Sequence, residues 1–197
     1  MRKPRADHRH SIRIIAGQWR GRRLAIPRGT EVRPTPDRVR ETLFNWLAEL
    51  TVGATCLDLF AGTGALGLEA LSRGAREVWF VERDASLTRA LQSMLEELNA
   101  ADARVVQADA RAYLRKPPGQ SFDVAFLDPP YAEPLEPLLA QLGPWLANTA
   151  QIYVERAYSR DAPEPLDELA AALPGSRLVK QGRAAAVAFG LLRFERP

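Results

Sequence analysis

The sequence predicts an α/β fold, a doubly wound and mostly parallel seven-stranded sheet with a C-terminal antiparallel hairpin and a small N-terminal β-hairpin. Three observations support this. From Ala54 onward, strand-like apolar runs alternate with helical stretches. A glycine-rich loop directly follows the first of these strands. The apolar run 122–127 stops at an Asp-Pro-Pro sequence, and proline neither continues a strand nor donates to a sheet.

Composition sets the outer limits of the prediction. At 197 residues, 46% of them hydrophobic, the chain fits one domain or one domain with a small appendage. Cys56 is the only cysteine, which excludes internal disulfides and a cysteine-rich metal site, and we expect no metal. No apolar run approaches the roughly 18 residues that span a bilayer, and the basic N-terminus lacks the apolar segment of a secretory signal. A cytoplasmic protein without a membrane partner is expected.

Charge is distributed unevenly along the chain. The first 40 residues hold twelve Lys or Arg and three acidic residues, a net charge of +9, whereas the remainder holds 15 basic and 21 acidic residues, a net charge of −6. A basic arm on an acidic body favours a polyanionic partner. The alternative interpretation is a solubilising tail.

The N-terminal region divides into two parts. Residues 1–11 are interpreted as a flexible basic leader, and residues 12–34 as a β-hairpin arm that binds RNA, because two β-prone runs flank a glycine-bounded turn. Arginines beside an aromatic ring suit phosphate contact and base stacking. Trp19 either stacks on RNA or packs the hairpin onto the body. The candidate RNA contacts of the arm are Arg13, Trp19, Arg20, Arg22 and Arg23.

A helix is expected to open the catalytic part of the chain, residues 35–197. Thr35 is a favourable N-cap and Pro36 suits the first helical position. Three arginines cluster at this helix start, where cations are unfavourable unless an anion lies opposite. They are further candidate RNA contacts: Arg33, Arg38 and Arg40.

The elements that follow alternate in type. The predicted strands are 55–59, 77–81, 104–107, 122–127 and 152–154, and the predicted helices are 65–73, 86–98, 110–114, 135–146 and 166–173. A closing hairpin is expected over 177–180 and 184–194, with its turn at 181–183.

The glycine loop indicates an adenosine-containing cofactor. Gly62, Gly64 and Gly67 satisfy G-x-G-x-x-G between a strand and a helix, and Glu82 ends the next strand, where it can bind ribose hydroxyls. Asp58, at the strand end beside this loop, would repel a diphosphate and attract the ammonium and sulfonium of S-adenosylmethionine. That favours S-adenosylmethionine over NAD. Asp109 can accept from the adenine amino group, cap the next helix, or do both.

Asp128 and the segment after it form the candidate catalytic site. A carboxylate, rigidly held carbonyls and an aromatic ring at the carboxyl end of a strand can receive a planar group that bears an NH2. The residues concerned are Asp128, Pro129, Pro130 and Tyr131. The alternative is a solvated turn in which Tyr131 anchors the core.

Residues 58–64 and 128–131 together resemble Rossmann-type methyltransferases of amino groups. The segments 13–22 and 33–44 make the chain similar to the bacterial small-subunit rRNA guanine-N2 methyltransferase D family, over about residues 12 to 195. Pro36 stands where that family leads us to expect a second threonine. The resemblance implies a class I methyltransferase that methylates N2 of guanine 966 in 16S rRNA, on the small ribosomal subunit or an assembly intermediate. We expect a monomer.

The resemblance also implies roles for individual residues. Asp128 and the Pro129 carbonyl would accept the two N–H groups of the guanine amino group, and Tyr131 would stack on the base. The cofactor S-adenosylmethionine, released as S-adenosylhomocysteine, would be held by Asp58, Phe60, Ala61, Gly62, Thr63, Gly64, Glu82, Arg83, Asp109 and Ala110.

Three other functions are compatible with parts of the sequence. The motifs could serve an adenine-N6 or cytosine-N4 methyltransferase, although about fifty residues before the core leave little room for a domain that reads a DNA sequence. The glycine loop and Glu82 alone would suit an NAD-dependent oxidoreductase. A non-catalytic ribosome-binding module with a vestigial cofactor site is the third.

Overall fold

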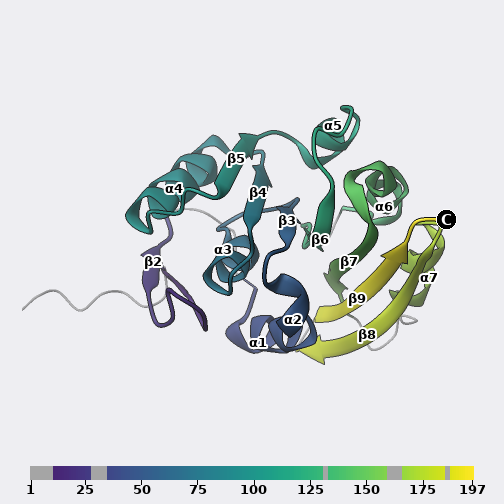
Figure 1. The fold of residues 1–197 in the computed structure, drawn as a ribbon, viewed down its shortest axis with the longest axis horizontal. Coiled ribbons are helices and arrows are strands. Elements are labelled where there is room, and N and C mark those ends of the chain that lie inside the picture. Colours follow the sequence, from purple (N-terminus) through teal and green to yellow (C-terminus); the bar gives the residue numbers. More distant parts are fainter. Residues whose placement is uncertain (1–10, 28–34, 131–132, 159–165, 185–186) are drawn as a thin grey trace, which may run out of the picture.

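A computed structural model describes residues 11–27, 35–130, 133–158, 166–184 and 187–197, and it shows a seven-stranded sheet with helices on both faces (Figure 1). The strand order is β5-β4-β3-β6-β7-β9-β8. The first five strands in this order are parallel to one another, and β9 runs antiparallel to both β7 and β8. The predicted doubly wound fold with a C-terminal hairpin is confirmed.

The bounds of the first four strands of the large sheet, β3 to β6, agree closely with the predicted ranges. The strands are β3 (Thr55–Asp58), β4 (Glu77–Glu82), β5 (Ala103–Gln107), β6 (Phe122–Leu127), β7 (Leu146–Ala157), β8 (Ser176–Ala184) and β9 (Val187–Glu195). The order reverses between β3 and β6, since the chain adds β4 and β5 on one side of β3 before it places β6 on the other. Ligands of open α/β sheets bind at the carboxyl ends of strands at such a reversal.

Alternating side chains of the parallel strands divide the core into two layers. Cys56, Val124 and Phe126 pack on one face, and Leu57 and Ala125 on the other. The first face is covered by α1 (Asp37–Trp46), α3 (Ala65–Ser72) and α4 (Ala85–Glu97), and the second by α5 (Ala110–Leu114), α6 (Glu136–Leu142) and α7 (Leu166–Ala171). A short helix α2 (Ala48–Thr51) follows α1. None of the helices that the structure describes is long and apolar enough to cross a membrane.

The C-terminal half departs from the predicted bounds. The helix expected over 135–146 ends at Leu142 and continues as a 3-10 turn, Gly143–Trp145, because Pro144 interrupts the helical hydrogen bonds. β7 is twelve residues long, four times the predicted strand, because β9 pairs with its polar ends as well as with its apolar centre. The turn predicted at 181–183 was wrong, since those residues are part of β8 and pair with β9.

The N-terminal hairpin, β1 (Ser11–Arg13) and β2 (Arg23–Ala25), packs on the body near α3 and α4 (Figure 1). Ile12, Ile14 and Leu24 are almost fully buried and belong to the same core cluster as α1 and α3. Gly17 approaches α3 so closely that an added Cβ would lie 1.7 Å from the Ser72 carbonyl oxygen. The arm is thus joined to the body by core packing.

Candidate active site

The ends of β3 and β6 bring two carboxyl groups to one edge of the sheet. Asp58 is the register partner of Phe126, and the Leu59 N–H donates to the Phe126 carbonyl at 3.1 Å. Asp128 follows Phe126 by two residues, so it lies just beyond this edge, and its negative charge acts on Asp58. The structure therefore places the two carboxyl groups that the sequence singled out in one neighbourhood.

Backbone conformations that favour glycine shape the loop between β3 and α3. Gly62 and Gly64 have φ angles of +52° and +79°. The Gly64 N–H donates to the Ala61 carbonyl at 2.6 Å, and the Ala61 N–H donates to Val81 at 2.9 Å, which fixes the loop against β4. Thr63 is buried, whereas Phe60 and Gly62 are partly exposed. The partly exposed backbone of this loop is therefore available to a ligand at the N-terminal end of α3.

Asp58 is a buried carboxyl group, 2% exposed, that accepts the Gly67 N–H at 3.0 Å. Burial raises its pKa to about 7, the negative charges of Asp128 and Glu82 act in the same direction, and the hydrogen bond from Gly67 opposes them. None of the residues that the structure describes forms an ion pair with it. Such a group binds a cation favourably, because a cation restores its ionised form.

Glu82 at the end of β4 reaches back to the glycine loop. One carboxylate oxygen accepts the Gly62 N–H at 2.8 Å, and the other accepts the Asp84 N–H at 2.7 Å. A carboxylate has about four acceptor positions, so both oxygens retain capacity for further donors. Arg83 beside it is exposed.

Asp109 caps the helix that follows β5. Its side chain accepts the Ala112 N–H at 3.0 Å, as the capping interpretation expected, and the carboxylate remains exposed. Ala110 is buried in the first turn of α5. The capping bond leaves Asp109 free to accept from a ligand as well.

Asp128 is partly buried at the end of β6 and accepts a hydrogen bond from the Thr35 hydroxyl at 2.9 Å. Burial raises its pKa to about 6, and the hydrogen bond from Thr35 opposes that rise. Pro129 is buried, and the exposed Pro130 accepts the Glu133 N–H at 2.8 Å. Tyr131 lies outside the described residues.

Thr35 does not cap α1 as predicted. Pro36 occupies the N-cap position and makes no side-chain cap, while the Thr35 hydroxyl points to Asp128 instead. A hydrogen bond from a hydroxyl to a charged carboxylate is stronger than a capping bond between two neutral groups. Sequence reasoning missed this residue of the site, because its local pattern matched a cap.

A second carboxyl group that sequence reasoning missed lies one strand away. Val154 of β7 pairs with Leu127, so Glu155 continues in register with Asp128. Glu155 is 5% exposed and accepts the Tyr153 hydroxyl hydrogen bond at 2.7 Å. Burial and the charge of Asp128 raise its pKa to about 7. The signal was available, since Glu155 follows an apolar strand core as Asp128 does.

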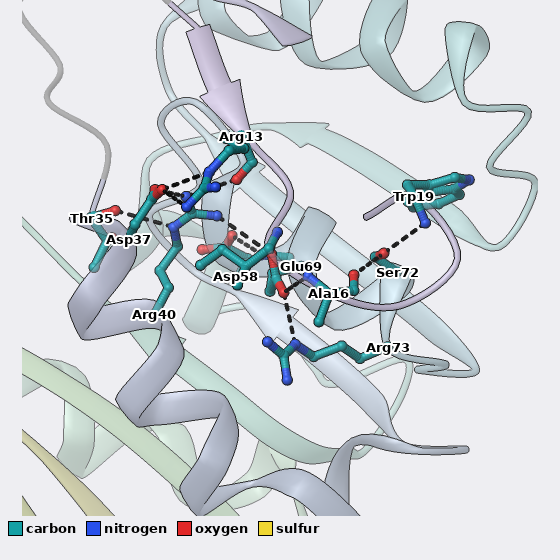
Figure 2. A network of polar contacts seen from close by, with 12 residues as sticks. Arg13, Ala16, Trp19, Thr35, Asp37, Arg40, Asp58, Glu69, Ser72 and Arg73 are labelled. Carbon is teal, nitrogen blue, oxygen red and sulfur yellow. Dashed lines mark hydrogen bonds and ion pairs between the residues drawn. The ribbon is translucent and has the colours of Figure 1, made fainter. Parts of the chain in front are cut away.

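Arg40 is a correction to the predicted RNA contacts. It is 2% exposed, and its guanidinium donates to the carbonyls of Thr35 and Arg13 and pairs with Asp37 and Glu69 (Figure 2). The anions opposite this arginine belong to the protein itself. Its side chain is therefore withdrawn from the candidate RNA surface.

The other predicted RNA contacts differ in their surroundings. Arg20, Arg23 and Arg38 are exposed, whereas Arg33 lies outside the described residues. Two further arginines form partly exposed ion pairs, Arg13 with Asp37 and Arg22 with Glu97, both at 2.8 Å. Trp19 is partly buried and packs against the core, and its backbone N–H donates to the Ser72 hydroxyl, which favours the packing interpretation of its ring.

Comparisons with known proteins identify the family. The family model described as "Conserved hypothetical protein 95" matches residues 12–175. The chain is 47% identical over 167 residues to the ribosomal RNA small subunit methyltransferase D of Escherichia coli K12, covering 83% of each chain. The protein of the same name from Haemophilus influenzae is 46% identical over 151 residues, 73% of this chain and 78% of the relative. The chain belongs to the ribosomal RNA small subunit methyltransferase D family.

Solved structures agree with this membership in the methyltransferase D family. A putative methyltransferase from Escherichia coli has 41% sequence identity and a TM-score of 0.83, with 95% of this chain and 99% of that chain covered. A putative methylase from Haemophilus influenzae has 37% identity and a TM-score of 0.75, with coverages of 94% and 99%. The N-terminal hairpin that is joined to the core therefore lies within the shared region.

Proposed function

We propose that this protein transfers a methyl group from S-adenosylmethionine to the exocyclic N2 of a guanine in 16S rRNA. The observation that carries the proposal is the shared edge of β3 and β6, where Asp128 stands beside Asp58 and the glycine loop. Asp128 can then orient the attacking nitrogen while Asp58 binds the cationic methyl donor in the same site. Membership in the methyltransferase D family supports rRNA as the acceptor.

The residues around the glycine loop fit the proposed cofactor. When bound, S-adenosylmethionine supplies an electrophilic methyl group on a positively charged sulfur. Asp58 lacks a basic partner among the described residues and suits a cationic amino acid moiety better than a diphosphate. We assign the methionine end to Asp58 and residues 60–64, the ribose to Glu82, with Arg83 beside it, and the adenine to Asp109 and the Ala110 backbone.

On the substrate side, Asp128 orients the amino nitrogen. The lone pair of a guanine amino group is delocalised into the ring, so this nitrogen is a poor nucleophile. An ionised Asp128 and the Pro129 carbonyl accept its two N–H groups and favour a pyramidal nitrogen whose lone pair faces the methyl group. Once the nitrogen is methylated, one of these protons would pass to the Asp128 carboxylate. We assign the stacking contact with the base to Tyr131, and the base must leave its helix or loop to enter the site.

The arm supplies the proposed contact with RNA. We assign residues 12–34 to RNA binding and residues 35–197 to catalysis, with Arg13, Arg20, Arg22, Arg23 and Arg38 as the described basic side chains. Their ion pairs with Asp37 and Glu97 are solvent-exposed and therefore weak, so phosphates can replace them. Trp19 contributes to the packing of the arm.

Two measurements on the purified protein test the proposal. Calorimetric titration with S-adenosylhomocysteine should show binding, and titration with NAD should show none. Labelled methyl groups should pass from S-adenosylmethionine to small-subunit rRNA, either free or in assembled particles, and not to double-stranded DNA. Binding of NAD alone would indicate an oxidoreductase, and label in DNA alone would indicate a DNA methyltransferase; either result contradicts the proposal.

A further inference from the structure

Glu69, in the middle of α3, is the buried centre of a polar network that joins α3 to the N-terminal arm and to α1. It is fully buried at 0% exposure, and its oxygens accept the N–H groups of Ile15 and Ala16 at 2.8 and 3.0 Å. The guanidinium groups of Arg73 and Arg40 pair with the same carboxylate at 2.7 and 3.5 Å. Glu69 thereby fixes the backbone of the N-terminal arm to α3 (Figure 2).

Arg40 extends this network to a third segment. Its Nη2 donates to the Arg13 carbonyl of the arm at 2.9 Å, and its Nε donates to the Thr35 carbonyl at 3.2 Å. The planar guanidinium fork fixes the direction of each of these bonds. The position of Thr35 is therefore set by a side chain that is itself held by Glu69 and by the arm.

The network ends at the candidate catalytic carboxylate. Thr35 is buried, its carbonyl accepts from Arg40, and its hydroxyl donates to Asp128 at 2.9 Å. A continuous series of hydrogen bonds thus leads from the arm through Arg40 and Thr35 to the group that orients the substrate nitrogen.

We propose that Arg40 and Glu69 are positioning residues, which set the orientation of Asp128 through Thr35 and make it depend on the placement of the RNA-binding arm. This inference rests on the proposed function. It assigns Arg40 to the step of methyl transfer, in place of the RNA contact that its sequence position suggested. When the arm is packed in its native position, the Asp128 carboxylate is held in the orientation that methyl transfer needs.

Substitutions at Thr35 test the last link of the network. Thr35→Val keeps the shape of the side chain and removes the donor, so kcat should fall by about 10- to 100-fold, in keeping with the loss of a hydrogen bond to a charged group. Affinity for S-adenosylhomocysteine and KM for RNA should change less than about threefold, because neither ligand is assigned to Thr35. Thr35→Ser retains the hydroxyl and should restore most of kcat.

A double-mutant cycle separates positioning from general stabilisation. Arg40→Lys keeps the charge and loses the fork, so kcat should fall by about tenfold. Because Arg40 acts through Thr35, the double variant should be no slower than Thr35→Val alone. Arg73→Lys is the matched control, since Arg73 pairs with Glu69 and does not reach Thr35, and its kcat should stay within about twofold of the wild type.

Two further readings complete the test. Glu69→Gln should accelerate amide hydrogen exchange at Ile15 and Ala16 and lower kcat non-additively with Thr35→Val, and it replaces Arg40→Lys if that variant does not fold. Multiplicative losses in the cycle, or an Arg73→Lys loss equal to that of Arg40→Lys, would overturn the inference while wild-type transfer stands. An inactive wild type would instead refute the proposed function.

Discussion

At the scale of single residues, Asp58 links stability to pH. Its pKa of about 7 lies above the ordinary value of 3.8, so at intermediate pH the folded protein keeps a proton that the unfolded chain has lost. The free energy of unfolding of the unliganded protein therefore decreases as pH rises from about 4 to about 7. The raised pKa values of Asp128 and Glu155 act in the same direction.

Asp58→Asn should weaken this pH dependence and reduce cofactor binding. Asparagine can still accept the Gly67 N–H but carries no charge, so at pH 8 the unliganded variant should be more stable than the wild type. Its affinity for S-adenosylhomocysteine should fall at least about tenfold, because an ion pair with the ligand ammonium is lost. Urea denaturation at pH 5 and pH 8, with calorimetry, measures both effects.

A matched control is available at the other end of the sheet. Asp123 accepts the Thr55 N–H at 2.8 Å and lies far along β6 from the glycine loop. Asp123→Asn should leave cofactor affinity unchanged. Equal pH dependence of stability in Asp58→Asn and the wild type would contradict the electrostatic account of Asp58.

Residue roles were predictable from sequence only where a local pattern carries them. Asp58 and Asp128 end apolar strands before turns, and the structure places both at one edge of the sheet. Thr35 was interpreted as a cap because Thr-Pro-Asp is typical of a helix start, and Arg40 as an RNA contact because it lies in a cluster of arginines. Their true partners, Asp128 and Glu69, are 93 and 29 residues away in sequence, and no local pattern specifies them.

At the scale of elements, the loop between β3 and α3 depends on one glycine conformation. Gly64 has a φ of +79°, and an added Cβ would lie 2.5 Å from Leu91 Cδ1 and 3.2 Å from Leu68 Cδ1. Gly64→Ala should therefore lower the free energy of unfolding by about 1 to 3 kcal/mol and abolish measurable binding of S-adenosylhomocysteine. Denaturant unfolding and calorimetry provide the two readings.

Gly119→Ala is the control for this prediction. Nothing lies within 4 Å of an added Cβ there, and its φ is not in the left-handed region. Stability and cofactor binding of that variant should match the wild type. Unchanged cofactor binding in Gly64→Ala would show that the loop conformation does not matter for the site.

The bounds of an element were predicted well where its own hydrophobic periodicity sets them. They were predicted poorly where pairing with a distant strand sets them. β6 and α5 have the predicted bounds, since each is a compact apolar pattern between clear breaks. β7 extends over the polar residues Thr149, Glu155 and Arg156 because β9 supplies a partner for each of them. The hydrophobic periodicity of one strand does not reveal which strand pairs with it when that strand lies thirty or more residues further along the chain.

At the scale of the whole molecule, the N-terminal region with the arm, residues 1–40, has a net charge of +9, whereas residues 41–197 have a net charge of −6. Each arginine that contacts a phosphate releases counterions, so it contributes about 0.7 to 0.9 to the slope of log affinity against log salt concentration. Replacing Arg20, Arg22 and Arg23 with alanine should lower the magnitude of that slope by about 2.1 to 2.7 in total. Filter binding of small-subunit rRNA over a series of salt concentrations measures it.

Arg177→Ala serves as the comparison for the arm. Arg177 is an exposed arginine of β8, at the opposite edge of the sheet from the arm. Its removal should leave the slope nearly unchanged. An unchanged slope in the triple variant would exclude the arm as the main phosphate-contacting surface.

The overall architecture followed from the sequence because alternating strands and helices allow few arrangements of a parallel sheet. The position of the arm did not follow. Its packing depends on Ile12, Leu24 and the close approach of Gly17 to Ser72, which are contacts between distant segments. This arrangement places the RNA-binding candidate and the catalytic candidate in one connected body.

The most direct test of the central claim compares wild type and Asp128→Asn by nucleoside analysis of methylated small-subunit rRNA. The wild type should yield N2-methylguanosine. Asp128→Asn should bind S-adenosylhomocysteine with unchanged affinity and transfer methyl groups at least about 100-fold more slowly, because the charged acceptor that orients the amino nitrogen is lost. Full activity in that variant, or a product methylated at adenine or cytosine, would contradict the account.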